Sequence, residues 1–204
     1  MITMPMFPLG SVLFPHMPLR LRVFEERYLI MLSEMLKADR GEFGVVLIER
    51  GPEVGGGEHR FSTGTTAEIT QLGAQEGYVG LRAQGHHRIE VVRWLEDAPH
   101  PVAKVEQLPE LLWDPALRPR LGEAERVVRQ ALAAATEFVD DVWPADVQLA
   151  DEPIALAWQL AGVAPLGPLD QLELLRSATA ADLLTKLIAA TQAAAATFAA
   201  GWSP

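Results

Sequence analysis

Short runs of apolar residues separate the first hundred positions of the chain into strand-like segments. Residues 18–23 (PLRLRV) alternate strictly between apolar and polar side chains, which is typical of a half-buried strand. Residues 43–48 (FGVVLI) are continuously apolar, which indicates a strand buried on both faces. Further strand-like runs follow at 63–70, 78–84, 87–94 and 100–108. Short strands at this spacing predict a β-barrel or a β-sandwich.

Two irregularities interrupt these strands. The alternation of 87–94 slips at Val91 and Val92, which predicts a β-bulge. Residues 24–37 have the helical period instead, and we expect one inserted helix there with an apolar stripe. The stripe is formed by Phe24, Tyr28, Met31, Leu32 and Met35.

After residue 110 the helical period replaces the alternation. Asp114 followed by Pro115 is a typical helix start, and Thr179 with Asp182 has capping-box spacing. We therefore expect helices starting near residues 115, 151, 167 and 179, packed as a helical bundle. Their core positions are predicted as Leu121, Val128, Ala131, Leu132, Ala135 and Val139, and, in the last helix, Leu183, Leu184, Leu187, Ile188 and Phe198.

Charge and composition narrow the class of protein. The formal net charge is −10, and most of the excess acid lies after Val105, which argues against nucleic acid as a partner. The chain has no cysteine and no asparagine, which fits a cytoplasmic protein. We expect no membrane-spanning segment, because prolines interrupt the apolar N-terminus and the uncharged C-terminal tail is mostly Ala, Thr and Gln.

Candidate chemistry is sparse. The glycine-rich stretch 51–60 (GPEVGGGEHR), predicted as a loop, lacks the Lys-Ser/Thr of a phosphate-binding loop. No serine pairs with any of the three lysines in a recognisable nucleophile motif. His86 and His87 are adjacent in a predicted strand, so we expect their side chains on opposite faces, where they do not share a metal. We therefore expect no catalytic, cofactor-binding or metal-binding residues.

One family carries the same order of motifs. The segment 6–28 (MFPLGSVLFPHMPLRLRVFEERY) resembles the start of the Lon protease N-terminal domain, also called the Lon substrate-binding domain. Its signature corresponds here to Phe24, Glu25, Arg27 and Tyr28. The runs TGTTAEI with Gly64, GHHRIEV with Gly85 and Arg88, VAKVEQLPE and LDQLELL are similar to later elements of that family, so the resemblance covers most of the chain.

The resemblance implies an α+β fold, with an N-terminal PUA-like β-barrel that has one inserted helix, followed by a C-terminal helical bundle. We place the barrel at residues 1–109 and the bundle at 110–204. We interpret the signature residues, Gly64, Gly85 and Arg88 included, as structural, because fold-building positions are the commoner reason for such a motif.

A whole Lon protease joins this domain to an ATPase module and a Ser-Lys protease module, and neither is encoded in these 204 residues. The resemblance therefore implies a non-catalytic module that recognises unfolded or exposed apolar polypeptide segments, or docks onto a protein partner. We expect binding in a concave region between barrel and bundle. Arg22, Arg88 and Trp94, assigned to outward strand faces, are the candidate peptide-binding residues. The alternative is an RNA-binding PUA-like protein, and an unrecognised enzyme ranks last.

Overall fold

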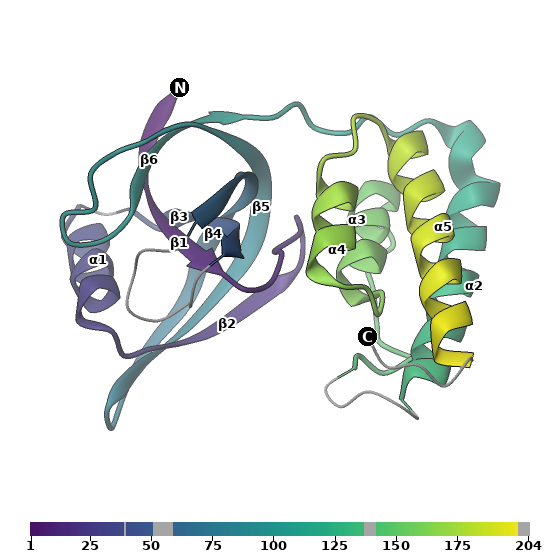
Figure 1. Cartoon of the computed structure of the whole chain (residues 1–204), viewed down its shortest axis with the longest axis horizontal. Helices are drawn as coiled ribbons and strands as arrows, with labels where there is room; N and C mark the ends of the chain where they lie inside the picture. Colours follow the sequence, from purple (N-terminus) through teal and green to yellow (C-terminus); the bar gives the residue numbers. More distant parts are fainter. Residues whose placement is uncertain (39, 51–58, 137–141, 200–204) are drawn as a thin grey trace. The chain divides into compact units, whose positions relative to one another are not determined.

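Strands and helices are segregated along the chain in the computed structural model, which describes residues 1–38, 40–50, 59–136 and 142–199. The chain divides into two compact units, Met1–Glu110 and Leu111–Pro204. All six strands lie in the first unit with one helix, and the other four α-helices of the described part lie in the second (Figure 1). The fold is therefore α+β, as predicted.

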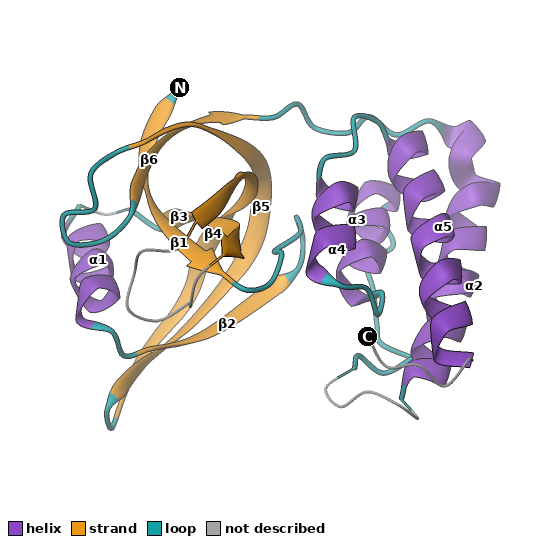
Figure 2. Ribbon diagram, in the orientation of Figure 1, coloured by secondary structure: helices purple, strands orange, loops and turns teal. Residues whose placement is uncertain are grey.

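The six strands form one sheet that returns to itself (Figure 2). They are β1 (Ile2–Leu9), β2 (Pro18–Val23), β3 (Glu42–Arg50), β4 (His59–Gln75), β5 (Tyr78–Trp94) and β6 (Val102–Gln107). The strand order is β2-β5-β4-β3-β1-β6, and β6 also pairs with β5. The hydrogen-bonded circuit β5-β4-β3-β1-β6 is thus closed. Strand β2 is not part of this circuit and, among the described strands, pairs with β5 alone.

Two prolines lie inside β1, although β1 has a neighbouring strand on each side. Its antiparallel pairing with β6 spans Ile2–Pro5, and its parallel pairing with β3 spans Met6–Leu9. Pro5 and Pro8 therefore each have a ladder partner on one side only. Proline is tolerated there because its missing N–H faces no partner strand.

Two β-bulges shape β5. The predicted bulge is confirmed, because the pairing with β6 shifts between Val91 and Arg93. A second shift lies where Thr65 pairs with Arg88 and Ala67 with Gly85, so that His86 and His87 together oppose one residue of β4. The prediction that these two histidines face opposite sides is wrong. The bulge breaks the alternation, and their ring centroids lie only 3.8 Å apart.

The closed sheet surrounds an apolar core. Buried side chains from four of its strands meet there, and Trp94 packs against them while remaining partly exposed. The cluster comprises Met4, Met6, Val46, Ile89, Val91, Ala103 and Val105. This is the result expected from alternating strands whose apolar side chains all face one interior.

The inserted helix α1 (Glu26–Lys37) begins two residues later than the apolar stripe suggested. Tyr28, Met31, Leu32 and Met35 are buried as predicted, but Phe24 precedes the helix and is 56% exposed. Glu25 has extended backbone at the N-cap position, so the helical period does not reach back to Phe24. The predicted inward position of Phe24 is therefore wrong.

The described residues of the second unit contain four α-helices: α2 (Arg118–Ala135), α3 (Pro153–Val163), α4 (Pro168–Leu175) and α5 (Ala180–Ala199). A short 3₁₀ turn, Pro115–Leu117, precedes α2, and the Asp114 carboxylate accepts from the Ala116 N–H at 2.9 Å. The predicted core positions of α2 and α5 are buried up to Ala135 and Ile188, together with Trp158 of α3. The predictions for residues 51–58, Val139 and the side chain of Phe198 lie outside the described residues.

Candidate functional site

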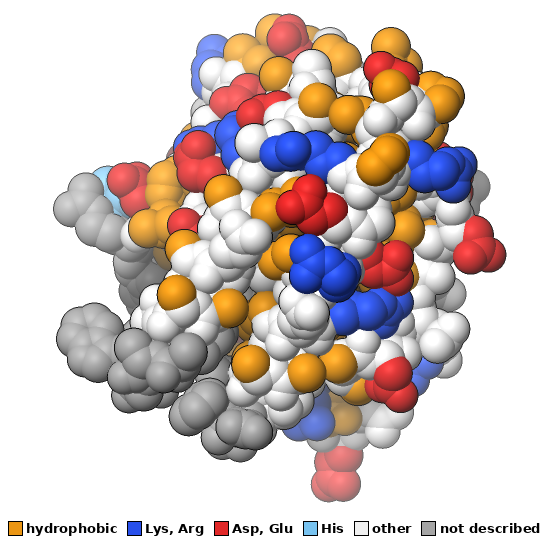
Figure 3. Space-filling view, turned by 90° about the vertical axis from the view of Figure 1, so that its right-hand side faces the viewer, with side chains coloured by type: hydrophobic (Ala, Val, Ile, Leu, Met, Phe, Trp, Pro, Cys, Tyr) orange, Lys and Arg blue, Asp and Glu red, His pale blue; other side chains and the backbone are white. Residues whose placement is uncertain are grey.

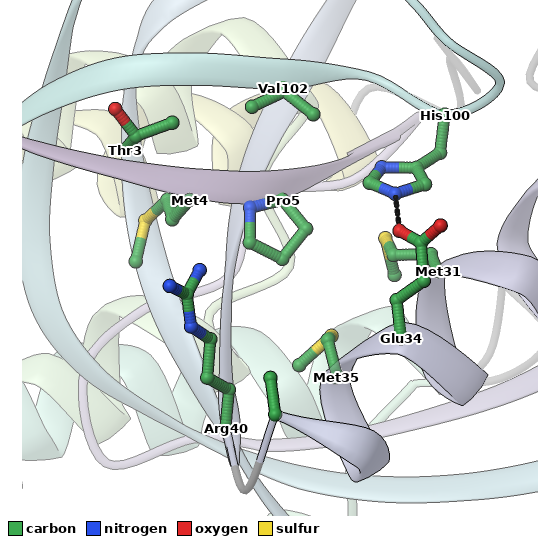
Figure 4. Close-up of a pocket in the computed structure, with 10 residues that line it drawn as sticks. Thr3, Met4, Pro5, Met31, Glu34, Met35, Arg40, His100 and Val102 are labelled. Atoms are coloured by element: carbon green, nitrogen blue, oxygen red, sulfur yellow. Dashed lines mark hydrogen bonds and ion pairs between the residues drawn. The ribbon is translucent and has the colours of Figure 1, made fainter.

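A pocket of about 330 Å³ lies between α1 and the strands β1 and β6 (Figure 4). Three segments distant in sequence form its wall, namely the start of β1, the second half of α1 with Ala38 and Arg40 after it, and the residues that lead into β6. Its volume is at the lower end of the range for pockets that hold small ligands. The lining residues are Thr3, Met4, Pro5, Met31, Glu34, Met35, Ala38, Arg40, His100 and Val102.

Met4, Met31 and Met35 form an apolar floor in this pocket, which we call the methionine pocket. Met31 and Met35 are one helical turn apart on the buried face of α1, and Met4 lies across from them on β1 (Figure 4). All three side chains are at least 95% buried. Methionine is unbranched and polarizable, so it adapts to ligands of different shape and is frequent at promiscuous binding surfaces.

A histidine–carboxylate pair closes one side of the pocket. His100 Nε2 lies 3.0 Å from Glu34 Oε2, and Nδ1 lies 3.2 Å from the Pro101 carbonyl oxygen. Both neighbours are hydrogen-bond acceptors, so a protonated imidazole donates from both nitrogens, whereas a neutral ring donates from one. His100 is buried and Glu34 is largely exposed, so the pair links α1 to the segment before β6 at the surface.

A single cation lies on the other side. The backbone N–H of Arg40 donates to the Met35 carbonyl at 2.9 Å, which fixes the turn after α1. The Arg40 side chain is exposed and extends toward Met4 and Pro5, opposite Glu34 and His100 (Figure 4). Among the described residues, no carboxylate forms an ion pair with it. The pocket thus combines a methionine floor with one cation on its rim.

The signature residues form a stack against β1. The Tyr28 ring is buried and lies parallel to Phe7, with ring centroids 3.9 Å apart and an interplanar angle of 10°. The Arg27 guanidinium lies 4.5 Å from the Tyr28 ring centroid, and its Nε is 3.1 Å from Glu25 Oε2. The ring stack of Tyr28 on Phe7 therefore joins the start of α1 to β1, while the cation–π and ion-pair contacts of Arg27 order the signature residues themselves. Phe24 stands outside this stack.

Gly64 and Gly85 lie where two backbones approach each other. A Cβ on Gly64 would collide with the Val45 carbonyl oxygen of β3, and one on Gly85 with the Phe14 carbonyl oxygen. The backbone of Gly85 also bonds to the segment before β2, since its N–H donates to Met17 and its carbonyl accepts from His16. These contacts fit the structural interpretation of both glycines.

The three candidate peptide-binding residues lie in separate surroundings. Arg22 is exposed on β2, 5.5 Å from the Tyr78 ring centroid, and lines a smaller pocket of about 220 Å³. Trp94 packs against the sheet core, with the Arg60 guanidinium 4.6 Å from its ring centroid. Neither residue lines the methionine pocket.

The exposure predicted for Arg88 is wrong, since it is only 5% exposed. One guanidinium nitrogen donates to the Pro109 carbonyl at 2.7 Å, because the chain returns over β5 after β6. Burial lowers the pKa of Arg88, while the nearby Glu110 carboxylate raises it. Arg88 is therefore tied to the chain and is not presented to a ligand.

The pocket is not predicted by the sequence patterns, although a signal for it exists. The helical period predicts Met31 and Met35 only as core residues, and no sequence pattern assigns a binding role to Met4, Arg40 or His100. All six methionines of the chain lie within its first 35 residues. That concentration could have directed attention to the elements that form the pocket, whereas Arg40 and His100 are brought to it by tertiary structure alone.

Comparison with known proteins places the chain in a family. The model of the ATP-dependent protease La (LON) substrate-binding domain matches residues 3–192, so the chain belongs to this family. A Lon N-terminal domain protein from Xanthomonas campestris is similar in structure, with a TM-score of 0.70, 28% identity, and coverage of 93% of this chain and 98% of that one. The family resemblance stated from the sequence is confirmed.

A second solved structure shares the fold at lower identity. The N-terminal domain of Mycobacterium avium complex Lon protease has a TM-score of 0.66 and 18% identity, over 94% of this chain and 98% of that one. A search of curated proteins gave no match. The two structural matches each span nearly the whole of this chain, helical unit included.

Other kinds of site are not indicated within the described residues. No group of three or more His, Cys, Asp or Glu side chains there could hold a metal ion. No helix in the described ranges has the length and apolar character needed to cross a membrane. On the face drawn in Figure 3, basic side chains are interspersed with acidic and apolar ones and form no continuous basic surface.

Proposed function

We propose that the chain is a non-catalytic polypeptide-recognition module, which holds apolar side chains of unfolded proteins or of a protein partner in the methionine pocket. The observation that carries this proposal is the pocket itself: an adaptable apolar floor, open at the surface, in a member of the Lon substrate-binding domain family. The chemistry available there is burial of apolar surface, which favours binding without breaking any bond.

We also propose a more specific description of each unit of the fold. We interpret the closed circuit of strands as a PUA-like β-barrel at residues 1–109 and the four helices as a bundle at residues 110–204. The pairing of β6 with both β1 and β5 supports the barrel. The shared apolar core of α2, α3, α4 and α5 supports the bundle. A cytoplasmic location, predicted from composition, stays a prediction.

The proposal is tested by filling the pocket without removing a core side chain. Ala38 lines the pocket and is exposed, so Ala38→Phe adds a ring there. Glu26→Phe adds the same ring at an exposed position of α1 that does not line it. We expect the Ala38 variant to bind a fluorescein-labelled, permanently unfolded polypeptide at least about fivefold more weakly, by loss of roughly 1 kcal/mol of apolar burial.

The control variant should bind like the wild type. No binding of the unfolded polypeptide by the wild-type protein at high micromolar concentration would contradict polypeptide recognition. Equal binding by both variants would contradict the pocket as its site. Salt-sensitive binding of single-stranded RNA, without polypeptide binding, would favour the RNA-binding alternative instead.

A further inference from the structure

The charges around the methionine pocket indicate which part of a polypeptide it prefers: an internal segment, the N-terminus or the C-terminus. An internal segment has no backbone charge, an N-terminus adds a cation, and a C-terminus adds a carboxylate. Glu34 is engaged by His100 through the 3.0 Å contact. Arg40 has no carboxylate partner among the described residues, and its side chain extends over the methionine floor (Figure 4). An anionic group on the ligand would therefore complement the charge of Arg40.

We propose that the pocket binds the C-terminal end of a polypeptide, with an apolar last side chain on the methionine floor and the free α-carboxylate beside the Arg40 guanidinium. This inference rests on the proposed function and names the part of the polypeptide that the pocket prefers. Guanidinium suits this role because its fork of N–H donors matches the two oxygens of a carboxylate.

The size of the pocket agrees with a chain end. A volume of about 330 Å³ holds one or two residues and no long segment. Thr3, Ala38 and Arg40 form an exposed rim, so the rest of a bound chain can leave toward solvent. Three methionines, in place of one rigidly shaped wall, accept different last residues as long as these are apolar.

The test compares two decapeptides that differ only at the last group. Both are fluorescein-labelled, rich in Gly and Ser and end in Leu-Leu, one as the free acid and the other as the amide. We expect the wild-type protein to bind the acid roughly three- to fivefold more tightly at low salt, as for a solvent-exposed ion pair. The preference should shrink at high salt, because salt screens exposed charges.

Variants assign the preference to one residue. Arg40→Gln should bind acid and amide equally, and Arg40→Lys should keep part of the preference. Lys37→Gln removes the same charge from an exposed residue that does not line the pocket, so it should behave like the wild type. In an NMR spectrum of ¹³C-methyl methionine, the acid should shift Met4, Met31 and Met35 but leave the core methionine Met6 unchanged.

The outcomes separate this inference from the proposed function. If the wild-type protein binds acid and amide equally, or if Arg40→Gln keeps the full preference, C-terminal recognition is wrong while polypeptide binding stands. If neither decapeptide binds and the unfolded polypeptide also fails to bind, both proposals are wrong. If the unfolded polypeptide binds but neither decapeptide does, the pocket does not recognise chain ends.

Discussion

A glycine, which has no side chain, can decide how closely two strands approach each other. At Gly64 the backbones of β3 and β4 are so close that a methyl group would meet the Val45 carbonyl oxygen. Gly73 lies in the same strand β4, yet a Cβ there would have no heavy atom within 4 Å. The two glycines are therefore a matched pair, one required by a close contact and one not.

We expect Gly64→Ala to lower the free energy of unfolding of the sheet unit by about 1–3 kcal/mol, the usual cost of forcing extra atoms into a packed site. Gly73→Ala should be neutral or slightly stabilising, since alanine loses less backbone entropy in a strand. Trp94 is the one tryptophan of residues 1–110, so ¹⁹F NMR of the 5-fluorotryptophan protein reports the unfolding of this unit in urea. Equal stability of the two variants would contradict the close-contact argument.

Arg88 shows what periodicity leaves out at the scale of one residue. Alternation correctly places its neighbour Ile89 in the core, which leaves Arg88 on the other face. Whether that face meets solvent depends on the path of the chain 21 residues later. Here Pro109 returns over β5 and accepts from the guanidinium at 2.7 Å, so the side chain is buried. No local pattern contains that information.

At the scale of elements, the predicted capping residues Thr179 and Asp182 both hold the first turn of α5, although the Asp182 carboxylate bonds Ala178 and not Thr179. The Asp182 N–H donates to Thr179 Oγ1 at 3.1 Å. The Asp182 carboxylate accepts from the Ala178 N–H at 3.2 Å and from Lys186 Nζ at 2.8 Å. The hydrogen bond from Lys186 is the main cause that lowers the pKa of Asp182, with a smaller contribution from Ala178.

This lowered pKa makes the contribution of Asp182 depend on pH. In the unfolded chain the pKa of an aspartate carboxyl is about 3.9. Because the folded pKa lies below that value, the stabilisation is fully present above about pH 4 and is lost as the pH falls through the folded pKa. We expect Asp182→Asn to cost about 0.5 kcal/mol at pH 7, as for an exposed i,i+4 pair, and progressively less below pH 4.

The measurement is urea unfolding of wild type and Asp182→Asn between pH 7 and pH 2.5. Asp170→Asn is the control, since Asp170 also lies in the first turn of a helix but accepts no side-chain hydrogen bond in the described part of the chain. A gap between wild type and Asp182→Asn that stays constant with pH would show that the carboxylate is not the stabilising group.

Elements with a strong period were predictable, and bulges were predictable only where they disturb an apolar pattern. The slip at Val91 and Val92 is visible because two apolar residues stand where one belongs. The bulge at His86 and His87 is not, because both residues are polar and either could face solvent. Strand β1 contains prolines and has no clear alternation of apolar and polar residues, so its sequence does not show that it pairs with a strand on each side. This pairing is possible because the ladder with β6 ends where the ladder with β3 begins.

At the scale of the whole molecule, closing the circuit of strands creates the pocket. Met4 and Pro5 come from β1, which joins β3 to β6, while His100 and Val102 come from the entry to β6. The sequence predicted the inserted helix and the strand that contains Val102, but it predicted neither β1 as a strand nor the meeting of these segments. That meeting follows from the pairing of the second residue of the chain with Val105, a contact between distant parts of the sequence.

The last prediction tests whether this closed unit is a domain in its own right. A fragment of residues 1–110 contains β1 to β6, the Pro109 carbonyl that binds Arg88, and Glu110. We expect it to unfold cooperatively, with the fluorotryptophan signal of Trp94 at the folded position found in the full chain.

A fragment of residues 1–100 lacks β6, so it leaves β1 and β5 without their shared partner and exposes the core around Ile89. Unpaired strand edges and an open core remove both hydrogen bonds and apolar burial, so this fragment should be unfolded or aggregate. If the longer fragment were also unfolded, the sheet unit would depend on the helices, and its closed circuit would not suffice for stability.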